Sequence, residues 1–229
     1  MPKTLLAIGA HYDDCVFGIP GILLQALRKH YRVVILSIIG DYTNWAPVKG
    51  RAKAFVDGIV VINKEYGAET RYLRYASHLF DVDRDTKRAV AEVVAEVQPD
   101  IAFMMWRHYH HHDHEVAATL SQVALPHGDR LLEQGNFKPV PLVYAYDNGP
   151  RHTIGFQPNV FVDVTAEWPR AIEWLGRLMA LVHNQPFDGK ALDGAQRAKE
   201  ALARYRGQTC GVTYAEALWL GTPRPQEIL

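Results

Sequence analysis

The chain has 229 residues, of which 48% are hydrophobic and 22% charged, a composition typical of a soluble globular protein with a sizeable core. The formal net charge is zero with neutral histidines, so no overall field favours nucleic acid or an acidic membrane surface as a partner. The two cysteines, Cys15 and Cys210, lack the spacing of a disulfide framework, and the absence of a recognisable signal peptide or membrane-spanning run predicts a cytoplasmic protein.

Short apolar runs alternate with segments of helical spacing along the chain. In chain order, the pattern predicts a strand at 4–10, a helix at 21–30, a strand at 31–39, a helix at 51–66, a short strand at 69–73, a helix at 86–98, a strand at 101–106, a helix at 115–125, strands at 141–146 and 159–164, and helices at 166–183, 194–205 and 213–220. This alternation predicts an α/β fold with a Rossmann-like, mostly parallel sheet and helices on both faces. No linker or repeat divides the sequence, so we expect one domain over residues 1–229.

A polar turn follows the first predicted strand. His11, Asp13 and Asp14 come directly after Ala10, where ligands of open α/β sheets bind. Histidine and aspartate supply nitrogen and oxygen ligands to a divalent metal. Two other interpretations compete: the aspartates could cap the next helix, or the turn could bind a nucleotide. The nucleotide interpretation is weakened because Gly18 and Gly21 do not form the G-x-G-x-x-G pattern.

A histidine cluster follows another strongly apolar strand. His111, Asp113 and His114 form an H-x-D-H pattern there, and Asp113 could orient a metal-binding imidazole. The neighbouring histidines His108, His110 and His112 are more simply interpreted as solvated side chains. Because both polar groups follow parallel strands, we expect them to meet at one edge of the sheet and to share a metal centre.

These two segments resemble motifs of a known family. Residues 10–14 resemble the A-H-P-D-D-E motif of the LmbE/PIG-L N-acetylglucosaminyl deacetylases, and residues 111–114 resemble the H-P-D-H motif of that family. Weaker similarities at 162–165, 183–185, 206–207 and 214–217 follow in the same order. The resemblance therefore extends over nearly the whole chain, although only the two metal motifs are specific.

The resemblance implies a Rossmann-like zinc enzyme. It implies that His11, Asp14 and His114 bind Zn²⁺, that Asp13 is the general base, and that His111 stabilises the oxyanion or acts as an acid. The implied reaction is removal of an acetyl group from an N-acetylated amino sugar or its conjugate. The resemblance also implies a homo-oligomer.

Three positions depart from the family pattern. Tyr12 and His112 replace prolines, and Cys15 replaces an acidic residue, although no implied ligand or base is lost. A small buried Cys15 is a simpler interpretation than a thiolate ligand. Two alternatives to the sugar deacetylase therefore remain: an amidase of the same fold acting on a non-sugar or thiol conjugate, and a catalytically inactive metal-binding protein.

Overall fold

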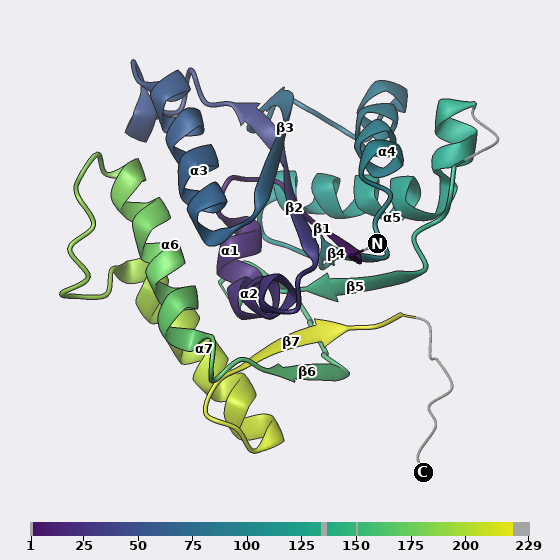
Figure 1. Cartoon of the computed structure of the whole chain (residues 1–229). Coiled ribbons are helices and arrows are strands. Elements are labelled where there is room, and N and C mark those ends of the chain that lie inside the picture. Colours follow the sequence, from purple (N-terminus) through teal and green to yellow (C-terminus); the bar gives the residue numbers. More distant parts are fainter. Residues whose placement is uncertain (1, 134–136, 150, 222–229) are drawn as a thin grey trace, which may run out of the picture.

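The computed structural model describes residues 2–133, 137–149 and 151–221. Across this part of the chain, seven strands form one sheet in the order β3-β2-β1-β4-β5-β7-β6 (Figure 1). The strands are β1 (Thr4–Gly9), β2 (Arg32–Asp41), β3 (Glu69–Ala76), β4 (Ile101–Met105), β5 (Leu142–Tyr146), β6 (Val160–Asp163) and β7 (Ala215–Trp219). Neighbours among the first five strands are parallel, whereas β7 runs antiparallel to both β5 and β6. The predicted mostly parallel sheet is confirmed.

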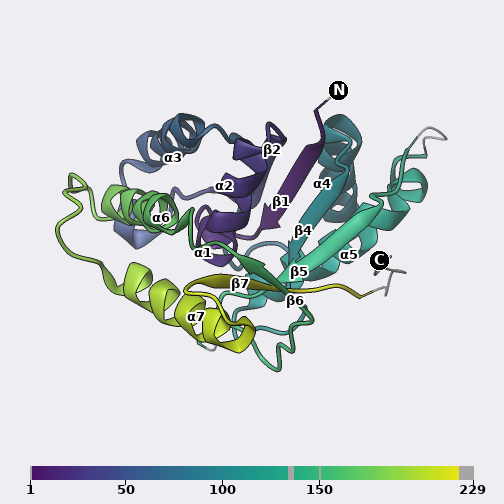
Figure 2. The same cartoon turned by 60° about the horizontal axis from the view of Figure 1, so that its bottom comes forward.

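Helices cover both faces of this sheet. They are α1 (Asp14–Gly18), α2 (Pro20–Arg28), α3 (Ala52–Tyr66), α4 (Arg84–Val97), α5 (His112–Leu132), α6 (Trp168–Val182) and α7 (Gly194–Cys210), with a 3-10 turn η1 (Ala46–Val48). Helices α4 and α5 pack together on one face, while α6 contacts α1, α2, α3 and α7 on the other (Figures 1 and 2). The predicted α/β class with two helical layers is therefore confirmed. None of the helices in the described ranges is both long and apolar enough to span a membrane.

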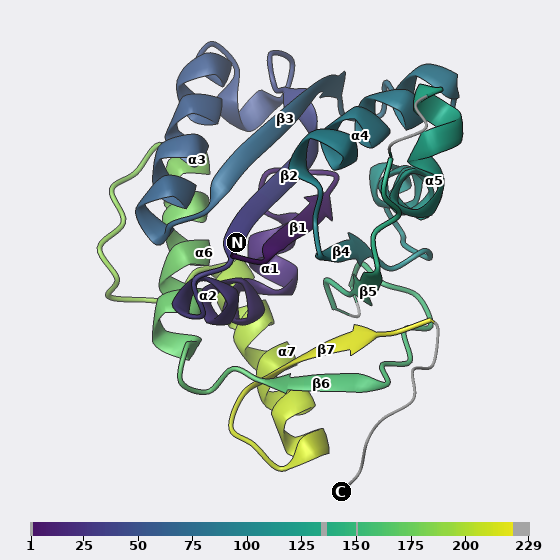
Figure 3. The ribbon, with the colours of Figure 1, turned by 45° about the vertical axis from the view of Figure 1, so that its right-hand side comes forward.

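The central strands bring the two polar segments together. Both β1 and β4 are almost entirely buried, which explains their continuous apolar sequences. They are parallel neighbours, so the chain leaves both strands at the same edge of the sheet (Figure 3). At Gly9 the backbone passes so close to Asp14 that an added Cβ would lie 2.7 Å from the Asp14 Cβ, so a residue with a side chain would not fit there without a shift.

The predicted helix at 213–220 is wrong, because this segment contains β7. The sequence Ala-Glu-Ala-Leu-Trp has good helix formers, but as a strand between β5 and β6 it buries its first four residues. Glu216 then lies fully buried and accepts hydrogen bonds from the backbone N–H groups of Gly21 and Ile22, with Lys199 completing an ion pair at 3.1 Å. Tertiary contacts therefore override the local preference. The short helix α1 was also not predicted.

We expect Lys199→Met to destabilise the fold, because it leaves the Glu216 carboxylate buried without its cation. Removing one partner of a buried pair costs about 3 kcal/mol, whereas an exposed pair contributes about 1 kcal/mol or less. Lys53→Met, which breaks the exposed Lys53–Asp57 pair of α3, is the matched control. Urea unfolding measures both variants, and equal free energies of unfolding would contradict the structural role of the Lys199–Glu216 pair.

Candidate metal centre

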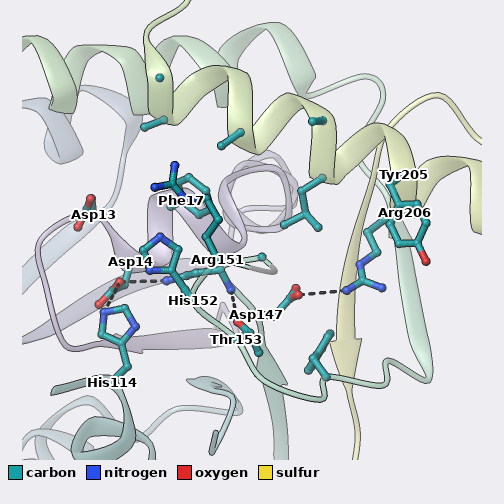
Figure 4. A pocket seen from close by; sticks show the side chains of 18 of the residues that line it. Asp13, Asp14, Phe17, His114, Asp147, Arg151, His152, Thr153, Tyr205 and Arg206 are labelled. Atoms are coloured by element: carbon teal, nitrogen blue, oxygen red, sulfur yellow. Dashed lines mark hydrogen bonds and ion pairs between the residues drawn. The ribbon is translucent and has the colours of Figure 1, made fainter. Parts of the chain in front are cut away.

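Three predicted ligands converge beyond the C-terminal ends of the central strands β1 and β4. Nδ1 of His11 lies 3.0 Å from Nε2 of His114 and 3.5 Å from Oδ2 of Asp14. Nε2 of His114 lies 3.3 Å from Oδ1 of Asp14, and Figure 4 shows these two side chains facing each other. His11 belongs to the turn after β1, Asp14 begins α1, and His114 lies in the first turn of α5.

The spacing of these side chains is of the size that a zinc ion requires. Bonds of 2.0–2.1 Å at tetrahedral angles separate neighbouring ligand atoms by about 3.3 Å. The two imidazole nitrogens lie 3.0 Å apart, and each lies close to a different oxygen of Asp14, at 3.5 Å and 3.3 Å. Three protein ligands leave a fourth position for water or substrate, as in catalytic zinc sites. Imidazole and carboxylate groups are also among the usual protein ligands of zinc.

The charges around the site also favour a cation. Burial lowers the pKa of His11, but hydrogen bonds to Asp113 and Asp14 outweigh burial and raise it to about 10. The two carboxylates thus stabilise positive charge between them. Burial lowers the pKa of His114 to about 4, so this imidazole is neutral near pH 7, as metal binding requires. The residues present therefore fit a divalent metal ion.

Asp113 holds the His11 ring from behind. Its fully buried carboxylate lies 3.2 Å from Nε2 of His11, on the opposite side of the ring from the converging atoms. The same carboxylate accepts hydrogen bonds from the Ser77 hydroxyl at 2.6 Å and from the backbone N–H of His78 at 2.9 Å. These contacts hold the His11 ring in the way that a metal-binding imidazole needs, so the predicted orienting role of Asp113 is consistent with them and stays a prediction.

The two adjacent aspartates have different surroundings. Asp14 is buried, and its carboxylate accepts hydrogen bonds from the His11 backbone N–H and from the Asn148 side chain. Asp13 occupies the N-cap position of α1, but its side chain makes no capping hydrogen bond, so the capping interpretation is not supported. Burial and the neighbouring Asp14 carboxylate raise the pKa of Asp13 to about 7, although His11 opposes this shift. Such a carboxyl group can exchange protons near neutral pH.

His111 lies beside the three converging side chains. Its ring centroid is 4.9 Å from those of both His11 and His114, and its Nδ1 accepts a hydrogen bond from the backbone N–H of Asp113. Burial lowers the pKa of His111. His111 also satisfies the spacing of a metal-ligand group with His11 and His114, so geometry alone leaves it available either as a ligand or as a catalytic side chain.

The remaining residues of the two motifs are placed outside the converging group. His108, His110 and His112 are exposed, as the solvated interpretation predicts. Tyr12 is buried against Tyr42, and Cys15 is buried with its Sγ 3.5 Å from the Tyr146 hydroxyl oxygen. Burial raises the pKa of the Cys15 thiol, which favours the small buried filler over a thiolate ligand.

Two pockets meet at this centre, and Asp13, Asp14, His114 and His152 line both. The first has a volume of about 720 Å³ and extends to α7; we call it the apolar arm after Phe17, Phe156, Ala198 and Leu202 in its wall, which also contains Asp147, Asn148, Arg151 and Arg206. The second has a volume of about 580 Å³; we call it the polar arm. The residues that line only this second pocket are His11, Tyr12, Asp41, Tyr42, Asn44, Trp45, Ala76, Ser77, His78, Leu79 and His111.

Sequence reasoning missed several contributors from later loops. Asn148 donates a hydrogen bond of 3.0 Å to Asp14, and the His152 ring stacks 6.1 Å from that of His114. His78 stacks on His111 with ring centroids 4.9 Å apart. Single polar residues in loops carry no spacing pattern, so only the position of Asn148 two residues after β5 could have indicated that it lies near the C-terminal ends of the parallel strands.

Comparisons with known proteins identify others with a similar sequence or fold. No family model matches the chain. A curated relative, the 4-oxalmesaconate hydratase of Pseudomonas putida, is 23% identical over 245 residues, covering 99% of this chain and 92% of that protein. The crystal structure of the 4-carboxy-2-hydroxymuconate hydratase from Pseudomonas putida KT2440 matches with a TM-score of 0.80 and 21% identity, covering 99% of each chain.

A deacetylase also matches. The N,N'-diacetylchitobiose deacetylase from Pyrococcus horikoshii is 20% identical, with a TM-score of 0.74 over 94% of this chain and 82% of that one. The chain has the fold of these enzymes. The predicted resemblance to LmbE/PIG-L deacetylases is therefore confirmed at the level of the fold, and the same fold also includes hydratases.

We expect His114→Ala to lower the amount of zinc bound, because it removes one of three converging ligand atoms. His110→Ala is the matched control, since it removes an exposed imidazole from the same cluster. Metal analysis of dialysed protein gives the stoichiometry, and circular dichroism shows whether both variants fold. Unchanged zinc in a folded His114→Ala variant would contradict its ligand role.

Asp113→Asn tests the supporting carboxylate. Loss of a partner that orients a metal-binding histidine reduces metal affinity by about 10-fold to 100-fold. We therefore expect zinc to bind with a dissociation constant raised by that factor, measured by competition with a chelator. An affinity equal to that of the wild type would show that Asp113 has only a structural role.

Proposed function

We propose that this chain is a zinc-dependent hydrolase that removes an acetyl group from an N-acetylated amino sugar or its conjugate. The observation that carries the proposal is the convergence of His11, Asp14 and His114 beside a carboxylate, Asp13, that makes no capping hydrogen bond. The fold of the diacetylchitobiose deacetylase supports it. In this proposal residues 1–229 act as one domain, because a single sheet contains strands from Thr4 to Trp219.

The proposed roles are those that the family resemblance implies, and the geometry of the side chains supports them. His11, Asp14 and His114 hold the zinc ion, which when bound lowers the pKa of water and polarises a carbonyl group. Asp13 accepts the proton of the attacking water, and its raised pKa suits transfer near neutral pH. His111 donates a hydrogen bond to the developing oxyanion or a proton to the leaving amine. A non-catalytic metal site has no need of Asp13, which argues against an inactive metal-binding protein.

The polar arm suits an amino sugar. Trp45 lies at its wall beside Tyr42, with ring centroids 5.7 Å apart, and the indole offers an apolar face on which a sugar ring can pack. Asp41 and Asn44 are exposed in the same arm and can bond hydroxyl groups. This combination favours the sugar over the non-sugar and thiol conjugates that the sequence left open.

Hydration of an unsaturated carboxylic acid is the second candidate. The favouring observation is that the 4-oxalmesaconate hydratase aligns with 99% of this chain. Addition of water to a double bond also needs an activated water and a general base, so the same centre can serve either reaction. Arg151, which lines the apolar arm, offers a cation for a carboxylate.

A product assay separates the two candidates. The zinc-loaded protein is incubated with N-acetylglucosamine, N,N'-diacetylchitobiose and N-acetylglucosamine conjugates, and released acetate and free amine are measured. A parallel assay follows loss of absorbance of 4-oxalmesaconate. Free amine supports the deacetylase, whereas hydration without amine release would replace it with the second candidate.

We expect Asp13→Asn to retain zinc but to lose most of its turnover, by about 100-fold or more, because general-base catalysis is removed. The amide is nearly isosteric with the carboxylate, so the fold should be unchanged. Zinc content and kcat are measured on the same sample. Turnover equal to that of the wild type would show that another group accepts the proton.

A further inference from the structure

His152 borders both arms, although neither sequence motif contains it. The residues that line both pockets are Asp13, Asp14, His114 and His152. The first three are assigned to zinc and to proton transfer in the proposed function, whereas His152 has no assigned role. Its ring stacks 6.1 Å from that of His114 and lies edge-on to the Phe17 ring at 6.4 Å (Figure 4). The imidazole of His152 therefore lies where the two arms meet the metal centre.

Hydrogen bonds hold the backbone at His152. The N–H of His152 donates to the carbonyl oxygen of Gly149 at 3.0 Å, and the carbonyl oxygen of His152 accepts from the N–H of His110 at 2.8 Å. A β-bridge between Tyr109 and Thr153 extends this pairing by one residue. The loop after β5 is thus tied to the histidine cluster after β4, and the His152 side chain projects from a defined position.

The ring nitrogens of His152 are free to contact a ligand. The side chain is exposed, and within the described ranges no protein group forms a hydrogen bond with its nitrogens. His152 also belongs to neither of the metal-ligand groups found among those residues. An imidazole has an N–H donor whether it is neutral or protonated, so a hydrogen bond from His152 to a ligand does not depend on its titration.

An amide bound at this junction has its carbonyl group at the centre and its two halves in the arms. The carbon that water attacks must lie within reach of the proposed zinc ion and of Asp13, which line both arms or lie between them. Because His152 also lines both arms, it borders the carbonyl group whichever way the amide runs. His111 lines the polar arm alone, so its neighbour in the substrate depends on the direction of the amide.

We propose that His152 contacts the substrate at the reacting carbonyl group and donates a hydrogen bond to the oxygen on which negative charge develops. The proposal rests on the proposed function, because it adds a donor to the same hydrolysis. A donor aimed at a developing oxyanion stabilises the transition state more than the bound substrate. His152 is thereby a catalytic residue that the loop after β5 contributes.

His152→Ala in the zinc-loaded full chain removes this donor. The assay uses the N-acetylated sugar of the panel that is hydrolysed fastest. We expect kcat to fall at least about 100-fold and KM to change less than about threefold, as for loss of one oxyanion donor. His110→Ala is the matched control, because its exposed imidazole lines neither arm. A wild-type kcat in His152→Ala would overturn the proposal.

Two conservative variants separate a catalytic contact from a structural role. His152→Asn and His152→Gln each keep an N–H donor, near the position of Nδ1 or of Nε2 respectively. We expect one of them to recover at least about tenfold of the lost kcat. Circular dichroism and zinc content are measured on the same samples. Recovery by neither variant, in protein that is folded and loaded with zinc, would contradict donation of a hydrogen bond by His152.

Binding of acetohydroxamate separates this proposal from the proposed function. This probe chelates zinc through its oxygens and carries negative charge there, so the test requires no turnover. We expect His152→Ala to raise the calorimetric Kd at least about tenfold, since a hydrogen bond to a charged group is lost, and His110→Ala to leave it unchanged. That result supports the contact even if no amide is hydrolysed, in which case only the proposed function fails. Equal Kd values for the wild type and His152→Ala would overturn the contact.

Discussion

The candidate centre depends on the parallel pairing of β1 with β4. Parallel neighbours end at the same edge of a sheet, so a turn after one strand and a turn after the other are forced together. This brings His11 beside His114 although 103 residues separate them in sequence. The continuous apolar sequences of the two strands, which hold them in the buried middle of the sheet, therefore determine whether a metal site exists at all.

Two buried carboxylates surround the histidine that the turn after β1 brings to the centre. Asp14 and Asp113 are buried on opposite sides of the His11 ring, and each is also hydrogen-bonded to the backbone. Buried carboxylates are costly unless they are paired and hydrogen-bonded. Imidazoles and backbone N–H groups provide part of this compensation, and a divalent cation held by Asp14, His11 and His114 would provide more. The buried carboxylates thus give this position the charge that would attract a cation.

The parts predictable from sequence are those with a repeating or adjacent pattern. Buried strands such as 4–10 and 101–106 are recognisable from apolar runs, and the H-x-D-H group from its position after one of them. The strand β7 was not predictable, because its residues favour a helix locally and only the contacts of Glu216 with Lys199 and α2 reveal its place. Asn148 and His78 were missed for a related reason: single loop residues acquire meaning only after folding brings them to the centre.

The same constraint explains why a fold alone does not specify a reaction. A metal at this edge with a nearby base activates water, and both deacetylases and hydratases share the surrounding sheet. The chemistry is then selected by what lies on either side of the activated water. Here one pocket offers His111 and Trp45, and the other an apolar face of α7 together with Arg151 and Arg206. The residues that line these two pockets are therefore the part of this chain on which the choice between the two proposed reactions depends.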